Sequence, residues 1–535
     1  ARLYVSHEVH PVLLRPRSAG VLLITTKKGR QGRARVNYEA WAGWTKPYNL
    51  IEVLNAQEFT DLKNEALVNA GTPPNATRGF ATMNDAAGNL IDTRWYDYVY
   101  RTGFAQNHSV SLSGANDKTN YYFSVGYTDQ EGMFVNNDYK RMTGRFTIDH
   151  KVTNAISIGG TFNYTNSFNS GLNTGSTGAA FNTSGAARLA FGLAPNVSPY
   201  TADGGYNINT TLNQIGQGNN KSNLAFTNPV MLLDLNKFTS KNDRVLANVY
   251  GQVALFRGLT FKSLYGVDNL SVVNEDFRNA IHGDGTQFAG AAQNVLQQPR
   301  RWNWQNTLTY DTRFADNHGL NVLVGAEQQY TRNNSWGADR RRVSDPFFDE
   351  FQGGYVEIVP TGNVLTENFL QSYFGRINYD FNRKYFLSAN VRRDGYSAFA
   401  NKWGTFYGGS AGWNISEESF WNEASFANVF SSFRLRGSYG MVGNFSGIGS
   451  YANLSLYNGG LYGNEASIFY AQAGNRDLTW EKSTKLDLGF NAGFFNDRLN
   501  LELTYYKNDI TDLILAEPQA PSRGIPGNSI LTNVG

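Results

Sequence analysis

Apolar and polar residues alternate with a period of two over many short segments, and this pattern constrains the fold more than any other feature of the sequence. Within residues 485–494, Leu, Phe and Ala at the even positions alternate with polar residues and Gly at the odd positions. Residues 499–505 alternate in the same way after Asn496-Asp497. Successive side chains of a strand point to opposite faces, so the two segments predict a hairpin with one apolar and one polar face.

The same hairpin unit recurs along most of the chain, and about fifteen strands are expected. Each has ~10 residues or more, the length that a strand needs to cross a bilayer. The turns that join them are predicted at Asn116-Asp117, 151–154, Arg257-Gly258, 315–319 and 382–384. No fixed repeat length is present, which argues against a solenoid.

The connections between the strands alternate between short and long. One end has turns of a few residues, and the other has the long segments 47–103, 168–240, 270–300, 332–367 and 445–478. Short periplasmic turns and long extracellular loops are typical of outer-membrane barrels, whereas a soluble sandwich or propeller does not require this asymmetry. Two helices are expected inside the loops, at 54–70 before Gly71 and at 229–236 beginning with Pro229.

A membrane setting agrees with the distribution of charge. No segment has the ~20 continuous apolar residues of a transmembrane helix, and residues 1–17 lack the pattern of a signal peptide. Either the protein is soluble, or the chain is part of a longer one, and the strand pattern favours the second.

Arg or Lys on the lipid face costs roughly 2–4 kcal/mol near mid-bilayer. The apolar faces carry no charge, and the opposite faces, expected to line a wet interior, carry Lys485, Asp487, Arg145, Asp149, Arg376 and Arg392.

Aromatic residues gather at the predicted strand ends, as an interfacial girdle requires. They are Tyr127, Tyr164, Tyr310, Tyr379, Phe381, Tyr385, Tyr505 and Tyr506. The alternative is a soluble sheet whose apolar face is buried.

The composition argues against most enzyme and nucleic-acid functions. The chain has no Cys and only six scattered His, so no thiol chemistry and no metal site are expected. A net charge of +3 gives no footprint for nucleic acid. No nucleophile elbow, phosphate-binding loop or dinucleotide fingerprint occurs in a suitable context, so neither a cofactor nor catalysis is expected.

Several segments together resemble the SusC/RagA-type TonB-linked outer-membrane transporters of Bacteroidetes. The most specific stretch is SYFGRINYDFNRKYFLSANVRRDGYSAFA (372–400) followed by WGTFYGGSAGWNISEE (403–418). In family order, the others are SAGVLLITTKKG (18–29), NYYFSVGYTDQEG (120–132), RGLTFKSLYGVD (257–268), LRGSYGMVGN (435–444), NRDLTWEKSTKLDLGF (475–490) and ILTNVG (530–535). The resemblance covers residues 18–535.

The resemblance implies an all-β fold, a large antiparallel transmembrane barrel of 22 strands around a plugged lumen. It further implies import of oligosaccharides or peptides across the bacterial outer membrane, powered through TonB and assisted by a SusD-like surface lipoprotein. The alternatives are a passive porin or structural surface barrel, or a secreted soluble adhesin. A strand at 21–26 before the first barrel strand speaks against a porin.

Matched to the family, the chain divides into a remnant of the plug at 1–31 and a barrel at 32–535. Residues 5–17 do not resemble family text, which indicates a misread stretch or an inserted loop. About 15–16 of the family's 22 strands are expected in this chain. The TonB-contacting segment and most of the plug are expected to lie outside it. The expected structure is a curved, incomplete barrel with a gap between edges at 32–45 and 499–516, and the strand at 21–26 is expected to lack partners from the rest of its plug.

One compact charged group lies inside the matched motif, Arg392, Arg393 and Asp394. These three residues are candidates for the upper lumen, in contact with the plug or the substrate. The other interpretation is an ion pair within the barrel wall that holds strand ends together. The substrate-contacting residues are otherwise unknown from sequence, because they are expected in variable loops.

Overall fold

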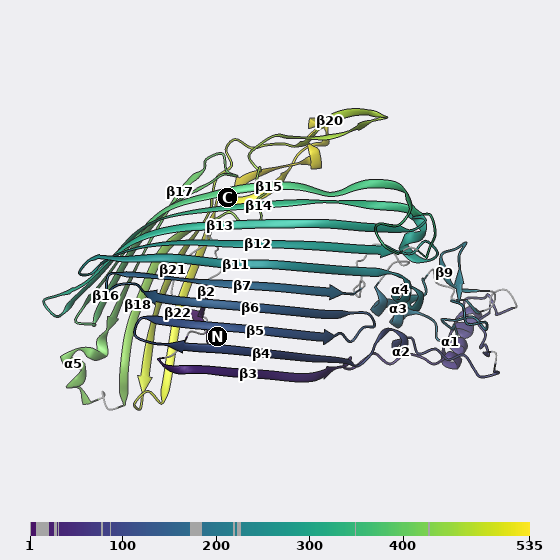
Figure 1. The fold of residues 1–535 in the computed structure, drawn as a ribbon, viewed down its shortest axis with the longest axis horizontal. Coiled ribbons are helices and arrows are strands. Elements are labelled where there is room, and N and C mark those ends of the chain that lie inside the picture. Colours follow the sequence, from purple (N-terminus) through teal and green to yellow (C-terminus); the bar gives the residue numbers. More distant parts are fainter. Residues whose placement is uncertain are drawn as a thin grey trace.

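The computed structural model describes residues 2–6, 21–25, 29, 31–75, 79–85, 87–171, 185–217, 220–221, 226–347, 349–425 and 429–535. Its main feature is one curved antiparallel sheet of 15 strands, each paired with the next along the chain (Figure 1). The strands are β3 (Gly32–Thr45), β4 (Gly103–Ala115), β5 (Thr119–Glu131), β6 (Asp138–Lys151), β7 (Ile156–Ser170), β11 (Lys237–Phe256), β12 (Leu259–Arg278), β13 (Ala291–Phe314), β14 (His318–Val343), β15 (Tyr355–Phe381), β16 (Tyr385–Tyr396), β17 (Trp403–Asn414), β18 (Phe430–Asn444), β21 (Glu481–Phe494) and β22 (Leu499–Thr511).

The sheet is open. No pairing joins its edge strands β3 and β22 in the described part of the chain. All 13 residues of β22 are exposed, as are nearly all of those of β3. The predicted incomplete barrel, with edges at these two segments, is confirmed. In lipid each unpaired backbone group costs several kcal/mol, so neither edge can face a bilayer unpartnered.

The predicted tight turns lie between paired strands at one end of the sheet. Only Arg257-Gly258 separates β11 from β12, and Gly258 has a φ of +84°. At the turn between β21 and β22, Phe495, Asn496 and Asp497 all have positive φ. Asn and Asp tolerate this left-handed conformation better than most residues, so the local sequence fixes the hairpin register.

Two of the expected long loops are wrong. Most of 270–300 and 332–367 is strand, because β12, β13, β14 and β15 contain 20, 24, 26 and 27 residues. The true connections are the short segments 279–290 and 344–354. These strands continue beyond the ~10 residues that a bilayer requires. There the exposed residues mix charged side chains such as Arg332 with apolar ones such as Trp336, so the regular alternation that reveals a membrane strand is lost.

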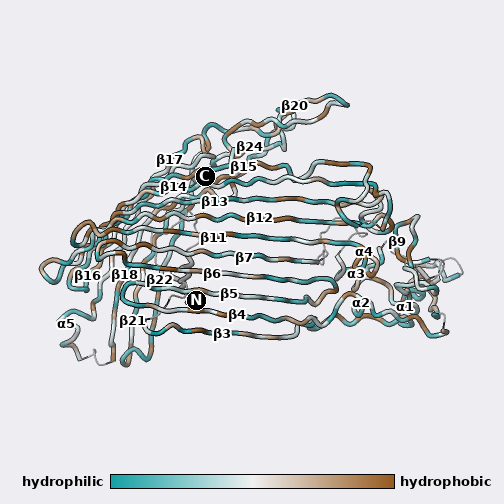
Figure 2. Tube along the Cα trace, in the orientation of Figure 1, coloured by the Kyte–Doolittle hydropathy of each residue, from teal (hydrophilic) through white to brown (hydrophobic). Residues whose placement is uncertain are grey.

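The two faces of the sheet differ as the alternation predicts, and residues of contrasting hydropathy alternate along the strands (Figure 2). On the convex face, Leu488 is 49% and Val249 60% exposed, where lipid is expected. Tyr506 is a correction to the expected girdle, because it lines the concave face beside Lys485 and Asp487. No helix among the described residues is long and apolar enough to cross a membrane.

Beyond the end opposite the tight turns, the connections fold into a layer of helices (Figure 1). The predicted helix at 54–70 is α1 (Ala56–Asn69), which begins at a capping box between Asn55 and Glu58. The predicted helix at 229–236 is α4 (Pro229–Leu235), capped by Asn228. Three short helices were not predicted: α2 (Tyr96–Val99), α3 (Ala186–Gly192) and, at the tight-turn end, α5 (Ser419–Asn422).

Smaller elements complete the fold. Two hairpins stand apart from the large sheet, β19 (Leu456–Tyr462) with β20 (Glu465–Gln472), and β23 (Leu513–Pro518) with β24 (Ser529–Val534). The layer of connections that contains α1 to α4, called the loop layer below, also contains β8 (Ile208–Asn209), β9 (Gln214–Gln217) and β10 (Asn220–Lys221). Short 3₁₀ helices lie at Gly283–Phe288, Ile415–Glu417, Pro521–Arg523 and Pro526–Asn528.

At the start of the chain, β1 (Arg2–Ser6) pairs with β2 (Val21–Thr25). The strand expected at 21–26 is therefore present, and it pairs with Arg2–Ser6, where no strand was expected. The atypical residues 7–17 lie outside the described residues. Gly29 exchanges two hydrogen bonds with the Asn120 side chain, at 2.9 and 2.8 Å, so the N-terminal segment reaches the tight-turn end of β5.

Candidate functional site

The concave face of the sheet is the candidate site, and it is hollowed near the tight-turn end. A recess of about 1010 Å³ is lined by residues of the strands from β13 to β22. Its charged residues are partly paired: Arg313 Nη2 lies 3.0 Å from Asp380 Oδ2, and Arg436 Nη2 lies 2.6 Å from Glu502 Oε1. The recess also contains Arg376, Lys485 and Asp487, three of the residues expected to face a wet interior.

Higher on the concave face, Arg392 and Asp394 form a buried ion pair. Arg392 Nε lies 2.8 Å from Asp394 Oδ1, and Asp394 is 1% exposed. The same guanidinium donates to Ser372 Oγ on β15 at 2.7 Å and to Glu327 Oε2 on β14 at 3.2 Å. Its carbon lies 5.3 Å from the centre of the Phe374 ring. One arginine therefore ties together three adjacent strands.

Arg393 lies on the opposite face from its two neighbours. It is exposed, and its guanidinium carbon lies 5.3 Å from the centre of the Trp403 ring. Trp403 in turn stacks on Tyr373, with ring centres 6.2 Å apart. The structure thus separates the three sequence candidates, because a strand turns alternate side chains to opposite faces.

An aromatic cluster near the outer end of the concave face was not predicted. Tyr396, Phe399, Phe406 and Trp480 are all at most 5% exposed, and the Trp480 indole donates to Lys402 O at 2.9 Å. The cluster brings together the ends of β16 and β17 with the segment before β21. A possible signal was the aromatic residue at 406, an inward position of β17, where lipid contact cannot explain it.

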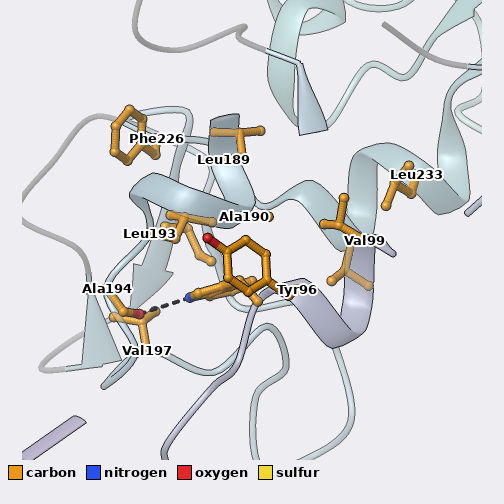
Figure 3. Close-up of a cluster of buried hydrophobic side chains, with 12 residues drawn as sticks. Tyr96, Val99, Leu189, Ala190, Leu193, Ala194, Val197, Phe226 and Leu233 are labelled. Carbon is orange, nitrogen blue, oxygen red and sulfur yellow. Dashed lines mark hydrogen bonds between the residues drawn. The ribbon is translucent and has the colours of Figure 1, made fainter. Parts of the chain in front are cut away.

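The loop layer has its own hydrophobic core, shown in Figure 3. Trp95 and Val99 from the α2 region pack against Leu189 and Leu193 of the α3 region, and the Trp95 indole donates to Ala194 O at 3.0 Å. The core also includes Val230 and Leu233 of α4. The layer is therefore a packed unit beyond the strand ends, able to hold recognition residues in fixed positions.

A buried polar network joins this layer to the connection between β12 and β13. The backbone N–H of Asn228 donates to Nε2 of His282 at 2.7 Å, and His282 is fully buried. Asn213 exchanges two hydrogen bonds with Gly283, at 2.7 and 3.0 Å. Burial lowers the pKa of His282 from 6.5 to about 4, so the ring is neutral at physiological pH.

Tyr206 is the other strongly shifted group of the layer. Burial, and then its hydrogen bond to Asp234 at 2.9 Å, raise its pKa to about 12. Among the described residues, no group of three or more His, Asp or Glu side chains is arranged to hold a metal ion. Neither loop residue was a candidate from the sequence, and both serve to hold the layer together.

Comparison with known proteins places this geometry in a family. A family model described as "TonB dependent receptor-like, beta-barrel" matches residues 191–535. TonB-dependent receptor P3 of Formosa agariphila is 28% identical over an alignment of 526 residues that covers 96% of this chain and 49% of that protein. TonB-dependent receptor SusC of Bacteroides thetaiotaomicron is 28% identical, over 93% of this chain and 49% of its own.

Solved structures show the same fold. The structure of the RagAB peptide transporter matches with a TM-score of 0.81 and 23% identity, and the match covers 97% of this chain and 59% of that one. A second state, the closed-closed RagAB peptide importer, gives a TM-score of 0.81 and 24% identity, over 98% and 60%. The chain spans about half the length of the curated relatives it matches.

Proposed function

Because this chain belongs to the TonB-dependent receptor β-barrel family of the bacterial outer membrane, we propose that it forms a large part of the wall of a TonB-dependent importer. The substrate class is oligosaccharides or peptides, and the partners are a SusD-like surface lipoprotein and the TonB complex. The similarity to SusC and to the RagAB peptide transporter supports this class. The family consists of transporters and receptors, and no enzymatic activity is proposed.

The observation that carries the proposal is the pairing of a polar concave wall with a folded layer over its outer end. Charged residues line the recess near the tight turns, and a packed core holds the loops beyond the opposite end. A passive porin needs an open lumen. A passive barrel is not favoured here, because the curated relatives that this chain matches are TonB-dependent receptors.

Arg392 and Asp394 are assigned a structural role in this proposal. Both side chains are buried, at 9% and 1% exposure, and both form hydrogen bonds within the barrel wall. Substrate contacts are assigned instead to the loop layer, including the segment 201–212, and to the loop at 445–478. Loops on a rigid scaffold commonly carry recognition.

The test is energy-dependent uptake in the native host. Cells with and without the gene are given fluorescent oligosaccharides and peptides too large for passive diffusion, before and after a protonophore collapses the inner-membrane gradient. The proposal expects uptake that requires both the gene and the gradient. Gene-dependent uptake that survives the protonophore would establish the passive barrel instead.

A loop deletion locates the recognition surface. Removing residues 201–212 is expected to weaken substrate or lipoprotein capture while the barrel still assembles. A deletion within the turn at 152–155, at the opposite end, is the matched control. Surface protease that cuts intact cells at 152–155 and not in the loop layer would reverse the assigned orientation.

A further inference from the structure

Two outward arginines lie directly opposite each other on neighbouring strands of the convex face. Arg300 on β13 is the paired partner of Arg332 on β14, and both are exposed. Side chains at directly opposed positions have Cβ atoms about 4.5–5.5 Å apart, and like charges there destabilise a sheet. The next residue along β13, Arg301, points to the other face, where its Nε donates to Thr331 Oγ1 at 3.3 Å.

The two charges are not balanced by the protein. Arg332 Nε lies 3.5 Å from Glu367 Oε1 on β15, while Arg300 has no hydrogen bond or ion pair with any described residue. Glu367 is shared with the Tyr330 hydroxyl, which donates to the same Oε1 at 2.7 Å. The pair of guanidiniums therefore has a single carboxylate, and a net positive charge faces outward.

An aromatic row lies immediately beside these arginines, toward the tight turns. Trp302 is two residues from Arg300, and its ring centre lies 6.1–6.2 Å from those of Tyr265, Tyr330 and Phe369. Such rows lie at the level of lipid headgroups. A second row, with His318, Phe314 and Phe381, lies near the tight turns.

The separation of the two rows matches a bilayer. Tyr330 follows His318 by twelve residues on β14. At about 3.4 Å per residue and a tilt of about 40°, this spans roughly 30 Å of height, close to the hydrocarbon thickness. Arg300 and Arg332 thus lie just outside the apolar band, at the level of the headgroups of the outer leaflet.

From this geometry we propose that Arg300 and Arg332 bind the phosphate of an outer-leaflet lipid of the lipopolysaccharide class. Paired guanidiniums suit a phosphate, which accepts several charge-assisted hydrogen bonds and relieves their mutual repulsion. The adjacent aromatic row contacts the acyl chains of the same molecule. The inference requires the outer-membrane location and is independent of transport.

The test is lipid retention by the full-length protein, purified in mild detergent from outer membranes of the native host and examined by native mass spectrometry with added lipid A. Replacing both arginines, Arg300→Gln with Arg332→Gln, is expected to lower the bound fraction of lipid A roughly tenfold, as loss of charge-assisted hydrogen bonds predicts. Dephosphorylated lipid A is expected to bind both proteins equally weakly.

Two further variants keep the result interpretable. Lys151→Gln with Arg257→Gln removes two exposed charges from the tight-turn end and is expected to leave retention unchanged. Arg300→Lys with Arg332→Lys keeps the charge and is expected to retain most of the binding. If the Gln pair fails to assemble, the single change Arg300→Gln takes its place and is expected to lower retention. The proposal is overturned if the wild type and the Gln pair retain lipid A equally. It is also overturned if the wild type binds dephosphorylated lipid A as well as intact lipid A. Displacement of the lipid by millimolar inorganic phosphate would identify a free-phosphate site and would also overturn it.

Discussion

Arg392 and Asp394 occupy alternate positions of β16, and the Arg392 Nε lies 2.8 Å from Asp394 Oδ1 on the concave face. Arg393, between them, points to the convex face and covers Trp403. The three consecutive residues therefore lie on two faces of the sheet. Arg392 and Asp394 form a buried ion pair on the concave face, and Arg393 contacts an aromatic ring on the convex face.

Breaking the buried pair should destabilise the wall strongly. Asp394→Leu leaves the Arg392 charge without its main partner, and removal of one member of a buried pair typically costs about 3–5 kcal/mol. The double change Arg392→Met with Asp394→Leu should be milder, because both of the buried charges leave together and only the partly exposed Glu327 loses a partner. Urea unfolding of the detergent-purified protein measures both. A double variant as unstable as the single one would show that packing, and not the uncompensated charge, dominates.

A charge on the convex face should impair assembly. Leu488→Arg or Val249→Arg places a guanidinium against lipid, at a cost of roughly 2–4 kcal/mol near the midplane. Asp487→Arg introduces the same group on the concave face, where water or polar neighbours solvate it. The yield of heat-modifiable protein in outer membranes compares them, and equal losses would contradict the assigned facing.

The loop layer should loosen in acid because His282 is buried neutral. Its pKa is lowered from 6.5 to about 4, so the opened state binds a proton that the folded state does not. The contribution to stability is complete above pH 6.5 and is lost as the pH falls toward 4, by up to roughly 3 kcal/mol. Hydrogen exchange of the Asn228 amide at pH 7.5 and pH 5 measures this. His282→Gln keeps a hydrogen-bond acceptor and should remove most of the difference in protection between the two pH values. If the difference is unchanged in this variant, another group causes the pH dependence.

The outer aromatic cluster should depend on a glycine. A Cβ built at Gly443 collides with the Phe406 ring, so Gly443→Ala should lower stability by about 1–3 kcal/mol through overpacking. Gly449, in the following loop, has nothing within 4 Å of the added carbon, and Gly449→Ala is the control. Equal melting of the two variants would show that Phe406 rearranges without cost.

The sequence predicted the membrane-spanning half of each strand well, because lipid imposes an apolar residue at every second position. It failed for 270–300 and 332–367, where the strands leave the bilayer and their outward residues include Arg300 and Arg332. Tyr506 was assigned to a girdle by residue type alone, although its register with Asp487 places it on the concave face.

The loop layer was visible in the sequence only where local chemistry marks an element. The Asn55 capping box and Pro229 identified α1 and α4, whereas the short helices α2 and α3 depend on long-range packing around Trp95 and Leu189. The buried partners of Arg392 come from β14 and β15, more than sixty residues away in one case, so no local pattern could reveal them.

Alternating thiol accessibility tests the assigned wall most directly. These 535 residues contain no Cys, so a single introduced Cys is the only thiol within them. Cysteines placed one at a time from 485 to 490 are treated, in intact outer membranes, with a small membrane-impermeant maleimide. Residues 485, 487 and 489 should react and residues 486, 488 and 490 should not, because water fills one side and lipid the other. Uniform labelling of all six positions, or labelling of only the even ones, would contradict the assignment of this sheet as the wall of an outer-membrane barrel.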